Sequence, residues 1–349
     1  MANHVVIMAG GIGSRFWPMS TEEKPKQFID VMGCGKSLLQ LTADRFKGIC
    51  SEQDVWVVTN KRYKDLVMEQ LPTIPENHIL LEPCRRNTAP CIAYASFRIK
   101  KEDPNANIVV TPSDHLVMNV AEFQRIINNC IKFASETDSI ITMGITPTRP
   151  ETGYGYIQAD LKQSSIRNKE LFRVDSFREK PDIDTAKSYL KQNNYFWNAG
   201  IFIWRVETIV NAFRIYQPNM ANLFEKLMPS FGTDEEQQLI DTHFPDCDNI
   251  SVDYAIMEKA EEIYVHSSDC GWSDLGTWGS LLQEIKKDFH GNAVIGSNIQ
   301  TYDTQNCIIN CTEEKRVVVQ GLDGYIVAEK DDTLLICKLA DEQKIKEFV

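Results

Sequence analysis

The sequence lacks any run of about 20 uncharged apolar residues, which is the length that a membrane-spanning helix needs. A membrane span is therefore excluded. The N-terminus also lacks the charged region, long apolar region and small-residue cleavage site of a signal peptide, because residues 1–8 enter a strand-like apolar run at once. We therefore expect a cytoplasmic protein.

Positive charge is also scarce, with 37 Lys and Arg residues against 49 Asp and Glu residues and a formal net charge of −12. Proteins bind nucleic acids by neutralising phosphates with clustered Lys and Arg, so this balance argues against a nucleic-acid partner. A small anionic ligand remains compatible with it. The ten cysteines include no Cys-x-x-Cys pair, so we expect reduced thiols rather than a structural zinc site.

Two common nucleotide-binding fingerprints are incomplete. A dinucleotide fingerprint counted from Gly11 through Gly13 would need a glycine at position 16, where Phe16 stands. A P-loop ending in Gly35-Lys36-Ser37 would need a glycine at position 30, where Asp30 stands. The glycines near the N-terminus therefore need another explanation.

Short apolar runs alternate with helical patterns over the first 145 residues. Continuous apolar strands separated by helices are typical of a parallel sheet that is covered on both faces. The sequence therefore predicts an α/β fold with a doubly wound, mostly parallel sheet, whose ligands bind beyond the carboxyl ends of the strands. We predict strands at 5–8, 55–58, 79–81, 108–111 and 140–143, and helices near 37–48, 61–71, 88–101 and 120–135.

The pattern changes twice further along the chain. From about residue 150 we predict a larger, mixed extension of the sheet, and after residue 291 short β runs follow one another with recurring turns, which suggests stacked β coils. We therefore predict a large domain at residues 1–285 and a small C-terminal β domain at residues 286–349. In the extension, strands are predicted at 154–159, 172–179 and 200–205, and helices near 183–193, 206–216 and 252–259.

A glycine cluster follows the first predicted strand, with Gly10, Gly11 and Gly13 ahead of Arg15. Glycines let backbone N–H groups approach phosphate oxygens, and a guanidinium group can bridge two such oxygens. Lys26 follows in an extended Lys-Pro-Lys segment and could reach the same phosphates. A tight turn between strand and helix is the alternative interpretation of this segment.

These segments and several others resemble, in order, the motifs of the sugar nucleotidyltransferases, and more narrowly of their guanylyl branch that acts on mannose 1-phosphate. The resemblance implies a Rossmann-like nucleotidyltransferase domain and a tail that forms a short left-handed β-helix. The matching segments are Gly-Gly-x-Gly-x-Arg-x-x-Pro at 10–18, Lys-Pro-Lys-Gln-Phe at 24–28, Glu-Pro-x-x-Arg-Asn-Thr-Ala-Pro at 82–90, Ser-Asp-His at 113–115, Gly-Tyr-Gly-Tyr-Ile at 153–157, Phe-Arg-Glu-Lys-Pro at 177–181, Trp-Asn-Ala-Gly-Ile-Phe at 197–202 and Trp-Ser-Asp-Leu-Gly at 272–276.

In this family an oxygen of a sugar 1-phosphate attacks the α-phosphorus of a nucleoside triphosphate in line, and pyrophosphate leaves. The attacking oxygen is already anionic near pH 7, so catalysis depends on positioning and charge neutralisation rather than on a general base. The resemblance implies that Arg15, Lys26 and Lys180 are the catalytic residues. It also implies that Asp114 and Asp274 hold Mg²⁺, which two carboxylates with phosphate oxygens and waters suit well.

Taken alone, the two aspartates have simpler interpretations. Asp114 could cap a helix or form a turn, and Asp274, ahead of Leu-Gly, could form an Asx turn.

The resemblance places the nucleotide against Gly10, Gly11, Gly13, Arg15 and Lys26. Selection of guanine needs a hydrogen-bond acceptor, for which Glu82 or a backbone carbonyl near Pro83 is a candidate. It also needs a donor, which we expect near Asn87 or Thr88. Glu82 could equally cap the following helix.

The resemblance places the sugar phosphate against four other residues. It gives Lys180 the phosphate and Glu179 the sugar hydroxyls, since a carboxylate that accepts from two neighbouring hydroxyls distinguishes their stereochemistry. Asn198 could donate to and accept from the same ring, and the backbone at Gly153 lies against the sugar. Alone, Glu179 and Lys180 would be read as an exposed ion pair, and Gly153 as part of a hairpin turn.

The leading hypothesis is therefore an enzyme that transfers GMP from GTP to α-D-mannose 1-phosphate with Mg²⁺, giving GDP-mannose and pyrophosphate. One alternative is a nucleotidyltransferase for another hexose 1-phosphate. Another, from a different class, is a non-catalytic sugar-nucleotide sensor. We also expect a homodimer formed through the C-terminal domain. Its apolar β runs form too few coils to bury their side chains alone, so the domain either pairs with a second chain or docks onto the large domain of the same chain. The resemblance favours the dimer, because tail-mediated pairing occurs in that family.

Overall fold

The computed structural model describes residues 1–11, 13–165, 168–311 and 315–348. The chain forms two compact units. Unit 1 contains residues 1–10, 43–112 and 117–272, and unit 2 contains residues 11–42, 113–116 and 273–349. Because unit 2 includes two segments from the N-terminal half, the units do not follow the predicted boundary at residue 285, which stays a prediction. No helix among the described residues has the length and apolar character needed to cross a bilayer.

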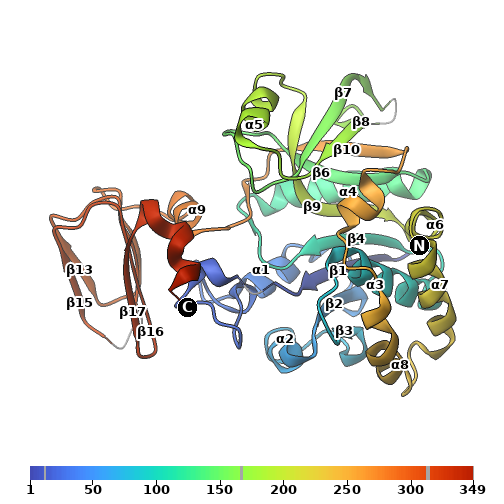
Figure 1. Ribbon diagram of the computed structural model, residues 1–349, viewed down its shortest axis with the longest axis horizontal. Coiled ribbons are helices and arrows are strands. Elements are labelled where there is room, and N and C mark those ends of the chain that lie inside the picture. Colours follow the sequence, from blue (N-terminus) through green and yellow to red (C-terminus); the bar gives the residue numbers. More distant parts are fainter. Residues whose placement is uncertain (12, 166–167, 312–314, 349) are drawn as a thin grey trace. The chain divides into compact units, whose positions relative to one another are not determined.

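In the described part of the chain, unit 1 is built on a nine-stranded sheet with the order β3-β2-β1-β4-β9-β6-β10-β8-β7 (Figure 1). Each strand predicted in the first 145 residues is present. The strands of this sheet are β1 (Asn3–Ala9), β2 (Val55–Asn60), β3 (Ile79–Glu82), β4 (Asn107–Pro112), β6 (Ile140–Ile145), β7 (Tyr156–Ser164), β8 (Leu171–Arg178), β9 (Tyr195–Arg205) and β10 (Ile263–Ser268). Two short strands, β5 (Leu116–Val117) and β11 (Trp272–Ser273), lie where the chain passes from one unit to the other.

The direction of pairing changes across the sheet. Strand β1 runs parallel to both β2 and β4, and β3 continues this parallel part. Strand β9 then enters antiparallel between β4 and β6, and β7 and β8 pair antiparallel. The parallel arrangement is thus confirmed for β1 to β4, but the sheet as a whole is mixed rather than mostly parallel, because β9 runs against both of its neighbours.

Most helices lie where the sequence predicts them. The exceptions are α7, α8 and α9, which were not predicted, and the segment predicted as a helix near 252–259, which is a π-helix at Asp253–Met257. The helices are α1 (Leu38–Asp44), α2 (Lys64–Gln70), α3 (Thr88–Glu102), α4 (Val120–Glu136), α5 (Ile183–Leu190), α6 (Val206–Tyr216), α7 (Pro218–Leu227), α8 (Glu236–His243) and α9 (Trp278–Glu284).

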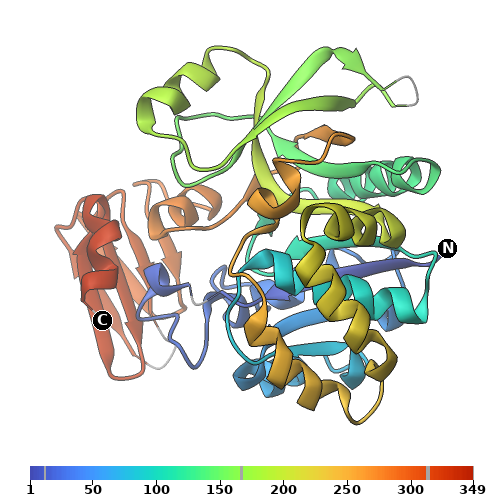
Figure 2. The same cartoon turned by 45° about the vertical axis from the view of Figure 1, so that its right-hand side comes forward.

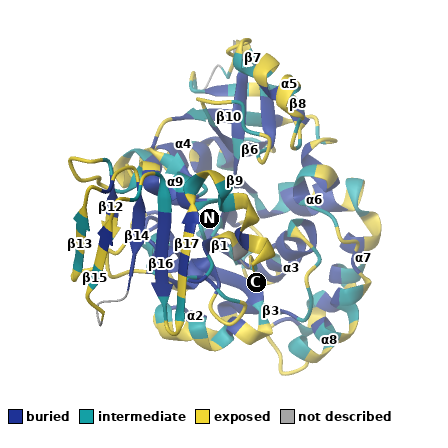
Figure 3. Ribbon diagram, turned by 60° about the vertical axis from the view of Figure 1, so that its left-hand side comes forward, coloured by how far each residue is buried: buried dark blue, intermediate teal, exposed yellow. Residues whose placement is uncertain are grey.

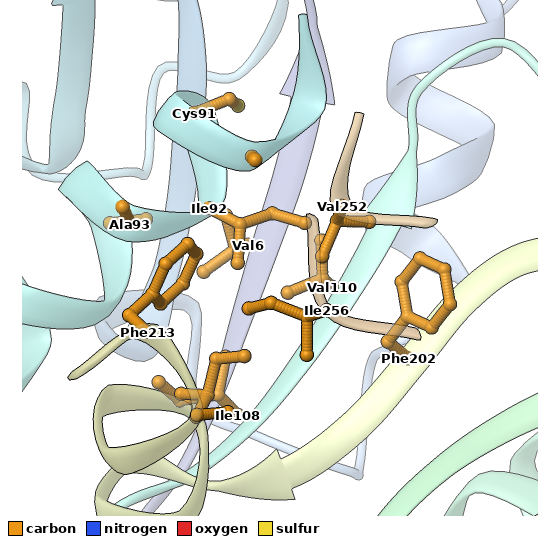
Figure 4. Close-up of a cluster of buried hydrophobic side chains, with 14 of the residues drawn as sticks. Val6, Cys91, Ile92, Ala93, Ile108, Val110, Phe202, Phe213, Val252 and Ile256 are labelled. Atoms are coloured by element: carbon orange, nitrogen blue, oxygen red, sulfur yellow. The ribbon is translucent and has the colours of Figure 1, made fainter. Parts of the chain in front are cut away.

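The main core of unit 1 lies between the sheet and helices α3 and α6. Figure 4 shows Val6 of β1 and Ile108 of β4 packed with Ile92 of α3 and Phe213 of α6, and all four side chains are fully buried. Val252 and Ile256 join the same cluster. Helix α4, whose buried residues are not part of this cluster, packs on β4, β6, β9 and β10. The core thereby fixes the carboxyl ends of β1 and β4 and the segment that contains the π-helix.

At the other end of the sheet, helix α5 packs on strands β7 and β9 (Figure 2). Tyr189 of α5 stacks on Tyr195 of β9 with ring centroids 3.9 Å apart, and it also contacts Tyr156 of β7. This aromatic packing fixes the start of β7 and the start of β9, where two of the sequence motifs lie.

Unit 2 contains the predicted C-terminal β domain. Strands β12, β14 and β16 pair in parallel, as do β13 and β15. Successive β coils therefore stack, with a strand of one coil paired to the equivalent strand of the next. Ala293, Ile308 and Ile326 are neighbours in register and are fully buried, while many residues of β13, β15 and β17 are exposed (Figure 3). The strands are β12 (Ala293–Ile295), β13 (Ile299–Tyr302), β14 (Ile308–Asn310), β15 (Val317–Gln320), β16 (Tyr325–Lys330) and β17 (Thr333–Lys338).

Candidate active site

The glycine loop begins at the carboxyl end of β1. Gly13 has φ +63°, and a Cβ built on it would lie 2.5 Å from the Cβ of Lys26, so only glycine fits there. A Cβ on Gly11 would meet no atom within 4 Å, so the loop is open at that position. Arg15 follows in a short 3-10 helix, Ser14–Phe16, and its side chain is exposed. The loop therefore offers open backbone and an exposed cation, as a phosphate site requires.

Lys26 is buried, and its ammonium group joins the two predicted metal-binding segments within unit 2. Nζ lies 2.9 Å from Oδ2 of Asp114 and donates to the backbone carbonyl oxygens of Asp274 at 2.9 Å and Leu275 at 3.1 Å. These contacts use the three N–H groups of the ammonium. Lys26 thus binds the two aspartate segments, and its expected role toward phosphates stays a prediction.

Asp114 is ionised by its surroundings. Burial alone would raise the pKa of this carboxyl group, but the charges of Lys26 and His115 and the hydrogen bond from Lys26 outweigh burial and lower the pKa below its usual value. The Nε2 atom of His115 lies 3.8 Å from Oδ1 of Asp114. Asp114 is therefore an anion throughout the neutral pH range.

Asp274 forms the Asx turn that was the alternative interpretation of this residue. Its Oδ1 accepts from the backbone N–H of Gly276 at 3.0 Å. A turn and a metal ligand are compatible, because a carboxylate has a second oxygen and further lone pairs. The described residues contain no cluster of three or more His, Cys, Asp and Glu side chains that could hold a metal by themselves. Two carboxylates suit Mg²⁺, which usually takes one or two protein carboxylates and completes its shell with phosphate oxygens and waters.

In unit 1, Glu82 ends β3 as a buried carboxyl group. Burial raises its pKa to about 8, and a hydrogen bond with the Cys91 side chain acts in the opposite direction. Its Oε1 atom is buried and has no hydrogen-bond partner among the described residues, whereas Oε2 lies 4.0 Å from the position of a Cβ on Gly10. The Glu82 carboxyl group thus lies near the start of the glycine loop through Oε2 and keeps Oε1 available for a hydrogen bond, as a base-recognition group requires.

The segment after Glu82 starts helix α3. Asn87, at φ +67°, caps the helix, since its Oδ1 accepts from the backbone N–H of Thr88 at 2.9 Å. The Thr88 hydroxyl accepts from the backbone N–H of Val252 at 2.9 Å and keeps its own proton to donate. This hydrogen bond connects the segment that we expect to contact the base with Val252, the residue before the π-helix Asp253–Met257.

Three of the predicted sugar-phosphate residues lie together around Gly155. A Cβ on Gly155 would lie 2.5 Å from Oε2 of Glu179 and 3.5 Å from the Cβ of Asn198, so a side chain at position 155 would displace the end of the Glu179 side chain. The backbone N–H of Asn198 donates to the Gly155 carbonyl at 2.8 Å, and the Lys180 ammonium forms an ion pair with Glu179. Gly153, in contrast, lies in a turn in which its N–H donates to Glu151 at 3.0 Å. Gly155 is therefore the glycine that lies against Glu179 and Asn198, and the expected place of Gly153 against the sugar stays a prediction.

The structure adds one acidic residue that sequence reasoning missed. Nδ2 of Asn198 donates to Oδ1 of Asp253 at 2.8 Å. Burial and the nearby Glu179 carboxylate raise the pKa of Asp253 to about 6. In the sequence Asp253 reads as an acidic residue in the first turn of a helix, and nothing there connects it with Asn198. Its place at the start of a π-helix, a form that is frequent at functional sites, is visible only in the structure.

Comparison with known proteins identifies the family. Residues 4–290 match the nucleotidyl transferase family, and residues 297–349 match the MannoseP isomerase/GMP-like beta-helix domain. The chain is 36% identical to a mannose-1-phosphate guanylyltransferase of Escherichia coli over 349 residues, which is 99% of this chain and 74% of that protein.

Two further relatives agree with this match. The xanthan biosynthesis protein XanB of Xanthomonas campestris pv. campestris is 35% identical over 99% of this chain and 72% of its own length. A crystal structure described as a mannose-1-phosphate geranyltransferase from Thermus thermophilus superposes with a TM-score of 0.88 and 28% identity, covering 100% of this chain and 98% of that one. The chain belongs to the nucleotidyl transferase family, among the mannose-1-phosphate guanylyltransferases.

Proposed function

We propose that this chain transfers GMP from GTP to α-D-mannose 1-phosphate, giving GDP-mannose and pyrophosphate. The similarity to relatives named mannose-1-phosphate guanylyltransferase supports the reaction. The structural observation that carries it is the ammonium of Lys26, which holds the segments of Asp114 and Asp274 in one place and keeps Asp114 ionised. Two aspartate segments that are held by one ammonium group suit the metal-bound triphosphate of a nucleotidyl transfer.

The reaction forms a bond between a phosphate oxygen of mannose 1-phosphate and the α-phosphorus of GTP. It breaks the bond between that phosphorus and the oxygen that leaves as pyrophosphate. No proton has to be removed from the attacking oxygen, so the protein acts by holding phosphates and neutralising charge. We assign the leaving pyrophosphate to Arg15 and the open glycine loop at Gly11 and Gly13, and the sugar phosphate to Lys180.

Enzymes of this family generally use a divalent metal, and we propose that this one uses Mg²⁺ held by Asp114 and Asp274. When bound, the ion would supply positive charge at the phosphate oxygens. The donor set fits, because both residues present carboxylate oxygen and Asp114 is kept ionised. Lys26 then acts as a positioning residue, since its contacts are with Asp114, Asp274 and Leu275.

We assign the guanine base to Glu82, the backbone near Pro83, and the segment of Asn87 and Thr88. The unpaired Oε1 of Glu82 supports this assignment, as does the free proton of the Thr88 hydroxyl. At neutral pH the raised pKa keeps most of the Glu82 carboxyl protonated in the free protein. It can then both donate a hydrogen bond to guanine O6 and accept one from N1–H or N2–H₂.

We assign the sugar ring to Glu179 and Asn198, whose side chains meet at Gly155. A matrix assay tests the whole proposal. Purified protein with Mg²⁺ is offered several nucleoside triphosphates, each with several hexose 1-phosphates, and pyrophosphate release is followed. We expect the fastest release with GTP and mannose 1-phosphate. A different best sugar would support the hexose 1-phosphate alternative, and a flat response would support a non-catalytic sensor.

We further propose a cytoplasmic enzyme in which the C-terminal β coils wind as a short left-handed β-helix and pair two chains. Strand β17 is last in the order β12-β14-β16-β17, and Leu334 and Ile336 on it are 58% and 56% exposed. An apolar edge strand is a template for a second chain. Leu334→Lys with Ile336→Lys should give a monomer by light scattering, whereas Leu161→Lys on β7 should leave the dimer intact. A monomeric unmodified protein, or a dimeric double variant, would exclude this interface.

A further inference from the structure

Asn198 is held in one orientation by groups from three segments. Its Oδ1 accepts from the backbone N–H of Gly200 at 3.0 Å. It also lies 3.3 Å from the Thr142 hydroxyl, whose single proton is shared with the Ile201 carbonyl oxygen at 3.3 Å. Its Nδ2 donates to Oδ1 of Asp253 at 2.8 Å. The Asn198 carbonyl oxygen is therefore bound within the protein. Among the described residues the second N–H of Nδ2 makes no further hydrogen bond, so Asn198 can offer this donor to a substrate.

Asp253 is itself firmly placed. It begins the π-helix, and its neighbours Val252 and Ile256 are buried in the main core of unit 1 (Figure 4). The backbone N–H of Val252 is bound by the Thr88 hydroxyl. The carboxyl group thus approaches Asn198 from a rigid part of the fold, 55 residues further along the chain.

This carboxylate stands in an unfavourable electrostatic environment. Burial and the Glu179 carboxylate disfavour its charge, and Lys180, which pairs with Glu179, opposes them only in part. Two acids beside one amide cost stability, and protein cores generally place such groups where binding or catalysis needs them.

We infer that Asp253 is a positioning residue for the sugar 1-phosphate: it fixes the amide of Asn198 so that one N–H points to a sugar hydroxyl oxygen, while Glu179 accepts the proton of a hydroxyl on the same ring. This inference rests on the proposed function. A donor and an acceptor held at a fixed separation recognise hydroxyl groups by position, because an analogue that lacks one leaves a buried polar group unpaired.

Kinetics with Asp253→Ala and Asp253→Asn test the inference. The alanine variant has no acceptor for Asn198, so we expect the KM for mannose 1-phosphate to rise about tenfold or more, with the KM for GTP unchanged. Asparagine keeps an acceptor oxygen, so Asp253→Asn should restore most of the lost affinity. Asp248→Ala, an exposed change in the same segment, is the matched control.

Monodeoxy analogues of mannose 1-phosphate separate positioning from a general structural effect. One analogue lacks the hydroxyl that Asn198 binds. For this analogue we expect Asp253→Ala and the unmodified enzyme to have the same KM, because the contact is missing in both. An unchanged KM for mannose 1-phosphate, equal rises for both substrates, or an equal loss with every analogue would overturn the inference.

The proposed function is checked separately, by pyrophosphate release with the unmodified enzyme. If that enzyme is inactive, the proposed function fails, and calorimetric binding of mannose 1-phosphate to the same variants still decides the role of Asp253. Melting temperatures show that each variant is folded.

Discussion

Two acidic regions of this protein contain the same residue type with pKa values shifted in opposite directions. Asp114 in unit 2 faces the ammonium of Lys26, and its pKa lies below the usual value in spite of burial. Asp253 in unit 1 faces Glu179, and its pKa is raised to about 6. Burial acts in the same direction on both carboxyl groups. The neighbouring charge therefore decides which aspartate is a permanent anion and which titrates near neutral pH.

The difference matches the chemistry that we assign to each region. A group that binds a cation has to stay ionised, and the Lys26 contact ensures this for Asp114. A group that orients an amide needs only to accept one hydrogen bond. Asp253 accepts it from Asn198, although its surroundings disfavour the ionised carboxylate. The following predictions test this contrast, from the largest expected effect to the smallest.

The largest effect should follow removal of a metal-binding carboxylate. Asp114→Asn and Asp274→Asn should each lower turnover by at least about 10²-fold, because several kcal/mol of transition-state charge stabilisation are lost. The fold should remain, as circular dichroism would show. Asp269→Asn, an exposed change, is the control. Unchanged turnover at saturating Mg²⁺ in either variant would remove that residue from the metal site.

Breaking the Lys26 contact should destabilise the protein. Lys26→Met leaves Asp114 without its cation, and removal of one partner of a buried ion pair costs about 3–5 kcal/mol. Since the Asp114 side chain is 32% exposed, we expect a loss at the lower end of this range, about 3 kcal/mol, in urea unfolding at pH 7.

The Lys26–Asp114 contact also makes the unfolding free energy depend on pH. The lowered pKa of Asp114 stabilises the fold above the unfolded pKa of about 3.9, and this contribution is lost as the pH falls through the folded pKa. Lys26→Met should remove that dependence, and Lys26→Met with Asp114→Asn should recover part of the stability. A double variant less stable than Lys26→Met alone would contradict the pairing.

The opposite sign is expected at Asp253. Its folded pKa of about 6 lies above the unfolded value of about 3.9, so the folded state holds the proton more tightly and stability falls as the pH rises through this interval. Asp253→Asn should therefore raise the unfolding free energy by about 1–2 kcal/mol at pH 7.5 and by little at pH 4. If Asp253→Asn lowered the unfolding free energy by the same amount at both pH values, the Asp253 carboxylate would not be disfavoured in the folded state.

The smallest effects should separate the two phosphate-binding cations. Arg15→Ala should lower turnover by about tenfold with a lesser change in GTP affinity, because charge develops on pyrophosphate mainly in the transition state. Lys180→Ala should instead raise the KM for mannose 1-phosphate. If Lys180→Ala raised the KM for GTP and left that for the sugar phosphate unchanged, the assignment of the two cations would be wrong.

The sequence determined much of this protein. Apolar runs predicted β1 to β4 because buried parallel strands are continuously hydrophobic, and the ordered motifs predicted the family, which the comparisons confirm. The motifs also named Glu179 and Asn198, which the structure brings together at Gly155. The roles of the site residues stay predictions until the variants are measured.

Only the tertiary structure decided which charges meet. Lys26 lies 248 residues from the Asp274 carbonyl that it binds, and Asp253 lies 55 residues from Asn198. Local periodicity reports which side of a strand or helix is buried, but it contains no information on which distant loop packs beside it. The mixed direction of the sheet has the same origin, since the place of β9 between β4 and β6 depends on the folding of the whole unit. Because a pKa depends on neighbours within a few ångströms, the opposite pKa shifts of Asp114 and Asp253 could be read only from the folded chain.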